Sequence, residues 1–214
     1  MRIDHLVWYS PDLAAGERHF SSMDNPPAYG GEHPGDATCN SLLSLGESTY
    51  VEILARDPKQ PAASLDKELA GLKGQGLYHW AVGGVDLAAI GQKAKAAGYK
   101  ASEVVSGGRR RPDGRLLNWK LVGLHDHPFG ALIPFFIDWT DSDHPALDAP
   151  RGGRLGGIEL SSPDAGKLNA LFKALGLDQP VAQGQKAGIT VTLEAQRGPL
   201  RLDSFDPLTR GFVI

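Results

Sequence analysis

Apolar residues along the chain form short runs, each followed by an aspartate and then by a helical pattern. The runs at residues 3–8, 77–82 and 157–160 predict buried strands. A carboxylate directly before a helical pattern can accept hydrogen bonds from the free N–H groups of the first turn, so we expect it to be the helix N-cap. The aspartates in this position are Asp12, Asp86 and Asp164.

The first two of these segments are copies of one another in the same register. Residues 5–15 and 79–89 both begin with a histidine and both have Asp-Leu-Ala-Ala starting seven positions later. A weaker third copy keeps Ser-Pro-Asp but has Gly157 where the others have His5 and His79. Recurrence at a fixed register predicts one supersecondary unit used several times.

Strand-like runs separated by turn residues follow each helical pattern. The predicted helices at 87–97 and 165–175 end at Gly98 and Gly176, where glycine allows the left-handed conformation of a C-cap. The unit is therefore strand–helix–strand–strand–strand, which predicts an α+β fold of repeated βαβββ modules. The strand-like runs are 37–45, 48–55, 102–105, 115–124, 131–139, 189–194, 199–203 and a short terminal run at 212–214.

Turn-rich segments divide the chain into modules. The segment 57–76 carries a predicted connecting helix capped by Ser64, and 141–155 is rich in Asp, Pro, Gly and Arg, as in an exposed linker. One βαβββ unit ordinarily buries its sheet face beside a second, so we expect the third to pack on the first two or on another chain, as in a homodimer. The predicted parts are paired modules at 1–57 and 76–140 within residues 1–140, the linker at 141–155 and a third, partial module at 156–214.

Composition excludes several classes of function. The 22 Lys and Arg against 25 Asp and Glu give a net charge of −3, without the clustered basic charge that nucleic-acid binding requires. The apolar runs fall short of the roughly 20 residues that cross a bilayer, so we expect no membrane partner. The single cysteine, Cys39, leaves no intrachain disulfide and indicates a reducing, cytoplasmic location. The 27 glycines match neither a phosphate-binding loop nor a dinucleotide fingerprint.

A repeated βαβββ unit with a histidine in its first strand resembles the vicinal oxygen chelate superfamily, which contains glyoxalases, extradiol dioxygenases and bleomycin-resistance proteins. More narrowly, the chain is similar to the glyoxalase-like domain family. The resemblance covers residues 3–139 and implies two modules forming one open, mixed, U-shaped sheet around a substrate cleft, often with a metal at its base. The segments that carry it are 3–7, 32–35, 40–46, 50–55, 111–114 and 134–139.

The resemblance implies a metal site. His5 and His79 match the first-strand ligand positions, and Glu52 matches the last-strand carboxylate of the first module. Two imidazoles and one carboxylate suit a divalent ion such as Fe, Mn, Zn or Ni, with open positions for substrate oxygens. The fourth position of the family pattern falls at Pro134, which has no ligand atom. A metal-free cleft is therefore the alternative.

Further polar residues lie in segments expected to face the cleft. The glycine-rich loop before the first strand-like run contains His33, a candidate for proton transfer because imidazole titrates near neutral pH. The arginines of the predicted loop 107–115 would clamp an anionic group, or would simply be the solvated tip of a hairpin. The candidate substrate-binding residues are Asn40, Arg109, Arg111, Trp119 and Phe135.

These observations support two hypotheses about function. The first is a metal-assisted lyase, isomerase or dioxygenase acting on a small, oxygen-rich, anionic substrate. The second, which the missing fourth ligand favours, is a metal-free protein of the bleomycin-resistance type that binds or sequesters a small molecule in an aromatic-lined cleft.

Overall fold

In this computed structural model, which describes residues 1–209, the chain begins with a strand, a helix and three more strands. Asp12 is the helix N-cap, and its side chain accepts a hydrogen bond from the Ala15 N–H at 2.7 Å, so the predicted cap is confirmed. The elements of this first module are β1 (Arg2–Ser10), α1 (Leu13–His19), β2 (Ala28–His33), β3 (Thr38–Gly46) and β4 (Thr49–Arg56).

Strand β2 was missed in the sequence, where its two glycines suggest a loop. A Cβ on Gly30 would collide with Asn40 Oδ1, and a Cβ on Gly31 would lie 2.7 Å from the Arg110 carbonyl oxygen. Gly31 also has a positive φ of 144°, which disfavours other residues. The prediction of a loose loop is wrong, because these glycines allow neighbouring strands to approach closely.

The second module repeats this order. Asp86 caps its helix through the Ala88 and Ala89 N–H groups, and Gly98 beyond the helix end has φ +84°, as the sequence predicts. The connecting helix is also present, but Asp66 is its N-cap rather than Ser64. The elements are α2 (Lys67–Gly71) in the connection, then β5 (Gly76–Gly83), α3 (Leu87–Ala96), β6 (Lys100–Ala101), β7 (Val105–Arg110), β8 (Leu116–Val122), β9 (Leu124–His125) and β10 (Phe135–Asp138).

Three strand assignments of the second module change. Of the predicted strand at 102–105, only Val105 lies in a strand, β7. The predicted loop at 107–115 begins as strand, because β7 continues to Arg110, and residues 111–115 form the hairpin turn. The predicted strand at 131–139 is shorter, because a 3₁₀ turn at Gly130–Leu132 precedes β10. As in β2, the glycines of β7 mark close packing rather than a loop.

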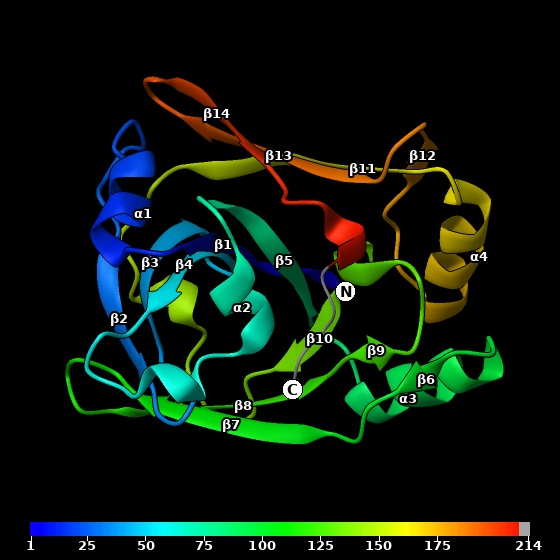
Figure 1. The fold of residues 1–214 in the computed structure, drawn as a ribbon, viewed down its shortest axis with the longest axis horizontal. Coiled ribbons are helices and arrows are strands. Elements are labelled where there is room, and N and C mark those ends of the chain that lie inside the picture. The colour runs from blue at the N-terminus through cyan, green and yellow to red at the C-terminus, as the bar shows by residue number, and fades with distance from the viewer. Residues whose placement is uncertain (210–214) are drawn as a thin grey trace.

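Eight strands of the two modules form one sheet, in the order β2-β3-β4-β1-β5-β10-β8-β7, and the short strands β6 and β9 pair with each other. In each module the first strand pairs parallel with the last, as β1 with β4 and β5 with β10, and antiparallel β1 and β5 join the halves. The sheet curves until its edge strands β2 and β7 meet, where the Arg109 guanidinium donates a hydrogen bond to the Gly30 carbonyl (Figure 1). The predicted α+β fold of paired βαβββ modules is confirmed, with a sheet that is nearly closed.

Side-chain alternation separates the two faces of this sheet. In β1, His5 and Val7 line a cavity on the concave face, whereas Leu6 and Trp8 belong to the main hydrophobic core. In β4, Glu52 lies on the cavity face and its neighbours Val51 and Ile53 lie in the core. Each of these two strands therefore contributes side chains to the hydrophobic core on one face and to the cavity on the other.

The third segment has the same order of elements but a different pairing. Its first strand pairs in parallel with the strand directly after the helix, not with the last strand. Gly176 ends the helix with φ +85°, as predicted, whereas the predicted terminal strand at 212–214 lies outside the described residues. The elements are β11 (Arg154–Ser162), α4 (Ala165–Leu175), β12 (Val181–Gln183), β13 (Gly188–Ala195) and β14 (Gly198–Asp203).

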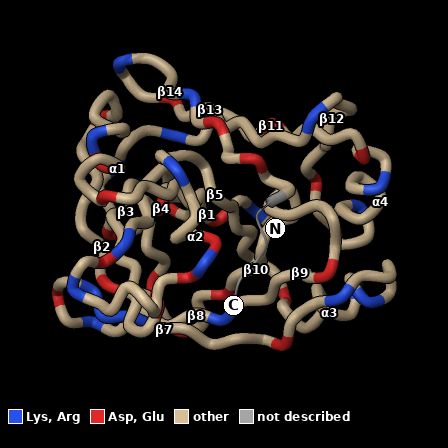
Figure 2. Tube along the Cα trace, viewed as in Figure 1, with Lys and Arg blue, Asp and Glu red and all other residues tan. Residues whose placement is uncertain are grey.

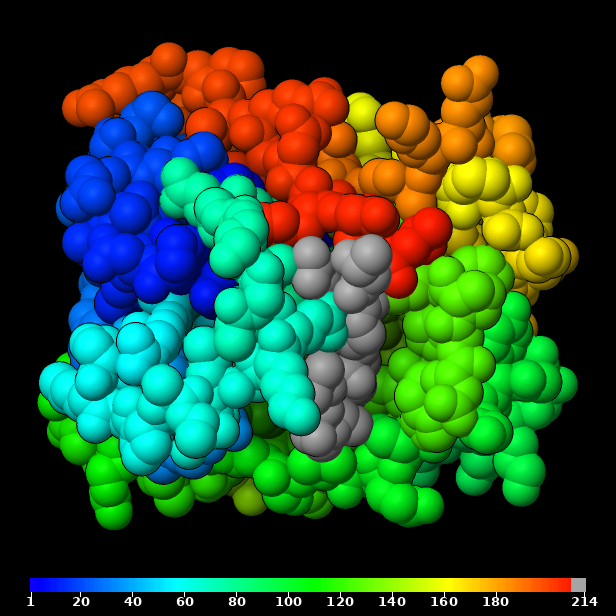
Figure 3. Space-filling model, viewed as in Figure 1, coloured from blue at the N-terminus to red at the C-terminus, as the bar shows by residue number. Residues whose placement is uncertain are grey.

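This third segment packs on the outer face of the large sheet, within the same chain (Figure 3). Phe172 of α4 makes an edge contact with Trp80 of β5, with ring centroids 6.4 Å apart, and Val191 of β13 joins the same core. The linker at 141–155 is not fully exposed, because Pro145 and Ala146 are buried. Packing within one chain therefore satisfies the apolar face that the third segment was expected to bury.

Acidic and basic residues are interspersed along the whole trace (Figure 2), consistent with the near balance of charge in the composition. Within residues 1–209, the helices are all too short or too polar to cross a bilayer.

Candidate active site

The concave face of the eight-stranded sheet encloses a cavity of about 680 Å³, a volume typical of a small-molecule site. Strands of both modules line it, and residues of the segment before and within α2 reach its rim. The polar side chains of the interior are His5, His33, Asn40, Glu52, His79 and Arg109. The aromatic side chains are Tyr50, Tyr78, Trp119, Phe135 and Trp139.

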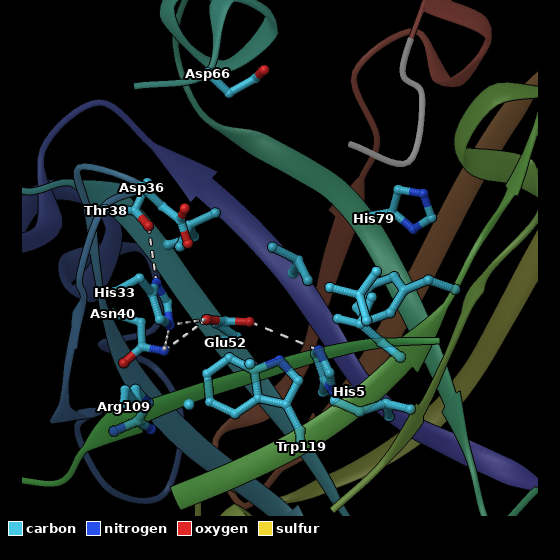
Figure 4. A pocket seen from close by; sticks show the side chains of 18 of the residues that line it. His5, His33, Asp36, Thr38, Asn40, Glu52, Asp66, His79, Arg109 and Trp119 are labelled. Carbon is cyan, nitrogen blue, oxygen red and sulfur yellow. Dashed lines mark hydrogen bonds and ion pairs between the residues drawn. The ribbon is translucent and has the colours of Figure 1, made fainter. Parts of the chain in front are cut away.

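Glu52 lies between two imidazoles on the cavity floor (Figure 4). Its Oε2 is 3.8 Å from His5 Nε2, and its Oε1 is 3.6 Å from His33 Nε2. The Asn40 amide donates to Oε1 at 2.6 Å. Burial alone would raise the pKa of Glu52, but the charges of His33 and His5 and the Asn40 hydrogen bond lower it below its usual range. Glu52 is therefore an ionised carboxylate at neutral pH.

His5 is held from behind by a buried carboxylate. Its Nδ1 is 2.8 Å from Asp4 Oδ1, and Asp4 also accepts from Trp139 Nε1 at 3.1 Å and lies 3.1 Å from His144 Nε2. Because ionised Asp4 can only accept, His5 carries a proton on Nδ1 and turns Nε2 toward Glu52. The His5 ring stacks on Tyr50 with centroids 4.7 Å apart. Both contacts fix the orientation of the imidazole.

His33 is held in the same tautomer by two neighbours. The Asn40 Nδ2 atom, which can only donate, lies 3.3 Å from His33 Nε2, so this nitrogen carries the lone pair. His33 Nδ1 then donates to Thr38 Oγ1 at 2.9 Å. Burial is the main cause of a lowered pKa for His33, which favours the neutral imidazole. Glu52 thus faces the Nε2 atoms of both imidazoles.

His79 does not join this group. The Trp80 N–H donates to His79 Nδ1 at 2.9 Å, and the Trp80 carbonyl oxygen lies 3.1 Å from the same nitrogen. The Phe135 ring has its centroid 5.3 Å from those of both His5 and His79, and His79 lies apart from Glu52 in Figure 4. Burial lowers the pKa of His79 to about 4, so it is neutral at pH 7.

The residues expected to hold a metal therefore do not fit one ion as a set. A shared ion would have to contact His5, Glu52 and His79 together, and His79 lies apart from Glu52. Within the described part of the chain, no three His, Cys, Asp or Glu side chains are grouped for an ion. The structure brings His5 and Glu52 together, adds His33 and Asn40, and leaves His79 elsewhere.

Of the other candidate residues, Trp119 and Phe135 line the cavity, as does Arg109. The Arg109 side chain reaches across the seam between β7 and β2, where its guanidinium bonds the Gly30 carbonyl, and it is only 4% exposed. Arg111 pairs with Asp148 in the linker. The pair of arginines expected to clamp an anion is thus split between the seam and an ion pair with the linker.

Sequence reasoning missed the support behind His5. Asp4 precedes His5 directly, so a carboxylate beside a candidate histidine was a usable signal. The sequence contains no such signal for His144 and Trp139, because both residues are far from Asp4 along the chain. His144 belongs to the linker that composition alone marks as an exposed boundary. Only the packing of this linker against β1 reveals the contact.

The paired βαβββ modules and the cavity inside their sheet define the vicinal oxygen chelate fold. The sequence profile of the family described as "Glyoxalase-like domain" matches residues 3–176, and the chain belongs to this family. The match extends beyond the segment that carries the resemblance in the sequence and includes the linker, β11 and α4.

Solved structures agree at the level of the fold. A hypothetical protein from Staphylococcus aureus has a TM-score of 0.68 at 15% identity, covering 93% of this chain and 97% of that one. A mutant of 4-hydroxymandelate synthase from Streptomyces coelicolor has a TM-score of 0.50 at 17% identity, covering 94% and 62%. A Mn(II)-bound glyoxalase from Novosphingobium aromaticivorans scores 0.47 at 9% identity, covering 94% and 81%. A search of curated protein sequences finds no significant match.

Proposed function

We propose that this protein is an enzyme that binds a small organic molecule in the cavity of the eight-stranded sheet and moves a proton on this molecule, with Glu52 as the base. One observation carries the proposal: an ionised carboxylate lies in the cavity between two imidazoles, with Oε2 of Glu52 3.8 Å from His5 Nε2 and Oε1 3.6 Å from His33 Nε2. A carboxylate held ionised away from water is a group able to accept a proton from a bound molecule.

The neighbours of Glu52 have distinct roles in this proposal. Asn40 orients the carboxylate through its 2.6 Å hydrogen bond, and His33 lies within 3.6 Å to receive or return the proton. His5 is fixed by Asp4 and limits rotation of the carboxylate on the other side. The aromatic walls take the apolar part of the ligand and exclude water around the reacting group.

The test is exchange of a C–H proton beside a carbonyl. The carboxylate takes the proton, the C–H electron pair moves to the carbonyl oxygen, and a deuteron from D₂O returns to carbon. We would follow 2-aminoacetophenone, 2-hydroxyacetophenone and phenylpyruvate by NMR with the wild-type protein and with Glu52→Gln. Exchange of at least one compound that Glu52→Gln abolishes is expected. Equal exchange with Glu52→Gln, or none with either protein, contradicts the proposal.

A binding protein without catalysis is the second candidate. The aromatic walls favour it, because Trp119, Trp139 and Phe135 would retain a ligand even where no reaction follows. Tight binding of a small molecule that is unchanged after prolonged incubation would support this candidate over the enzyme.

Metal assistance stays a prediction that elemental analysis would test. A divalent ion such as Fe, Mn, Zn or Ni would polarise a substrate oxygen. His5 and Glu52 are the members of the expected set that lie together. Stoichiometric metal in protein purified without added ions, lost in His5→Ala and retained in His79→Ala, would support an ion at this pair. Near-zero occupancy that added metal does not increase would remove it.

We also propose a reducing, cytoplasmic location and a homodimer, both from the sequence. Cys39, the single cysteine, is buried, and its pKa is raised by burial to about 11, which suits an unreactive thiol. Light scattering at high protein concentration tests the dimer, and a monomeric mass would contradict it.

A further inference from the structure

We propose that the molecule bound in this cavity carries a positive charge, as a protonated amine or a quaternary ammonium group attached to an apolar body. The inference rests on the proposed function in one respect only, since it takes the barrel cavity as the place where the small molecule binds. A cationic ligand differs from the anionic substrate that the arginines suggest in the sequence.

The formal charges lining the cavity favour a cation. The carboxylates of Asp36, Glu52 and Asp66 line it, and Arg109 supplies the opposing charge among the described lining residues (Figure 4). The Arg109 guanidinium is bonded to the Gly30 carbonyl in the seam, so part of its donor capacity is already used. An anion placed beside Glu52 would meet like charge in a region with little water, where repulsion is strongly felt.

A further negative charge lies directly behind the floor. Asp4 is fully buried, and its carboxylate oxygens lie 2.8 Å from His5 Nδ1 and 3.1 Å from His144 Nε2. Its partners are side chains of this chain, so it contributes to the field on the cavity rather than contacting the ligand.

The walls supply the second element of cation recognition. Trp119 and Trp139 both line the cavity, with ring centroids 5.9 Å apart and planes inclined at 63°. Phe135 and Tyr78 are on the same lining. The negative π-face of an indole attracts an ammonium or alkylammonium group within about 6 Å of the ring centre. Aromatic faces combined with a buried carboxylate are suited to a cation with an apolar body.

The remaining arginines near the cavity do not reverse this balance. Arg111 pairs with Asp148, and Arg115 pairs with Asp113 and with the same Asp148. These ion pairs lie in the turn after β7 and the linker, so their charges are offset locally. Arg109 is the one lysine or arginine among the described residues that line the cavity.

The test compares three probes of similar size and different charge: benzylamine, benzyl alcohol and benzoate. Their affinities for the full-length protein would be measured at pH 7 by calorimetry and by tryptophan fluorescence. Benzylamine is expected to bind at least about tenfold more tightly than benzoate, a ratio equivalent to about 1.4 kcal/mol. Equal affinities, tighter binding of benzoate, or no measurable binding of benzylamine would overturn the inference.

Matched variants test which residues cause the preference for benzylamine over benzoate. Asp36→Asn removes a charge at the rim and should weaken benzylamine several-fold, whereas Asp178→Asn removes an exposed aspartate of the third segment and should have no effect. Trp119→Leu should weaken benzylamine more than benzyl alcohol, because only the cation uses the ring face. Equal losses for the two probes would overturn this role of Trp119.

Different results would overturn the proposed enzyme activity and the proposed cationic ligand. A preference for benzylamine without Glu52-dependent proton exchange would overturn the enzyme and leave the cation site. Glu52-dependent exchange that occurs only with phenylpyruvate, together with equal binding of benzylamine and benzoate, would overturn the cation site and leave the enzyme.

Discussion

Gly107 of β7 lies directly opposite Trp119 of β8 in the antiparallel ladder, and the indole packs against the space where a Cβ would stand. A side chain at position 107 would collide with Nε1, Cε2 and Cζ2 of the indole. The absence of a side chain at Gly107 therefore sets how far Trp119 protrudes into the cavity. In this way a glycine in β7 shapes the part of the cavity wall that the neighbouring strand β8 forms.

Gly107→Ala is expected to displace the Trp119 ring into the cavity and to lower affinity for benzylamine. The ring is half-buried at the cavity edge, so it moves at modest cost in stability. The measurements are the wavelength of tryptophan emission and the dissociation constant of benzylamine. Unchanged emission together with unchanged affinity would show that the strand adjusts instead of the ring.

Gly91→Ala is the matched glycine variant, and it should stabilise the protein. Gly91 lies inside α3, and a Cβ there would meet no atom within 4 Å. Alanine has a higher helix propensity, so the free energy of unfolding should rise by roughly 0.5–1 kcal/mol. For a chain of this size, that corresponds to an increase of about 1–4 °C in the melting temperature. A fall in melting temperature would contradict the open environment of Gly91.

Removing the buried carboxylate of Asp4 should destabilise the fold strongly. Asp4→Ala leaves Trp139 Nε1 and the rings of His5 and His144 without their shared acceptor. Loss of one member of such a buried network costs about 3–5 kcal/mol. Asp4→Asn keeps an oxygen for Trp139 and should cost less. Urea denaturation measures both variants, and an Asp4→Ala protein as stable as the wild type would rule out the network.

His79 should make stability depend on pH between about 6.5 and 4. Burial lowers its pKa from 6.5 to about 4, so over this range the unfolded chain binds a proton that the folded protein does not. The free energy of unfolding should therefore fall as pH falls through this window, by about 3 kcal/mol in total. Above pH 6.5 the ring is neutral in both states and makes no such contribution.

The comparison is the pH slope of stability in His79→Gln, whose side chain does not titrate. Urea denaturation of both proteins at several pH values between 4 and 7 gives the slopes. The variant should lose stability less steeply on acidification than the wild type. Identical slopes would place the titration on other groups.

The repeat itself carries most of the information that the sequence holds about this protein. His5, His79 and the helix caps Asp12 and Asp86 are local in sequence, because a strand–helix unit is decided by alternation and by capping within a few residues. Glu52 is likewise found by its place among apolar neighbours in a strand. These features predict the modules, the α+β fold and one side of the cavity.

Tertiary packing decided the rest. That β2 and β7 are strands depends on glycines that admit Asn40, Arg110 and Trp119 from neighbouring strands, contacts that the local pattern does not contain. That Glu52 faces His33 rather than His79 depends on how the sheet closes and on the hydrogen bond that the Trp80 N–H donates to His79 Nδ1. Periodicity assigns a residue to a face of its own strand. The distance across a curved sheet, and hence the grouping of charges in the cavity, follows only from the closure of all eight strands.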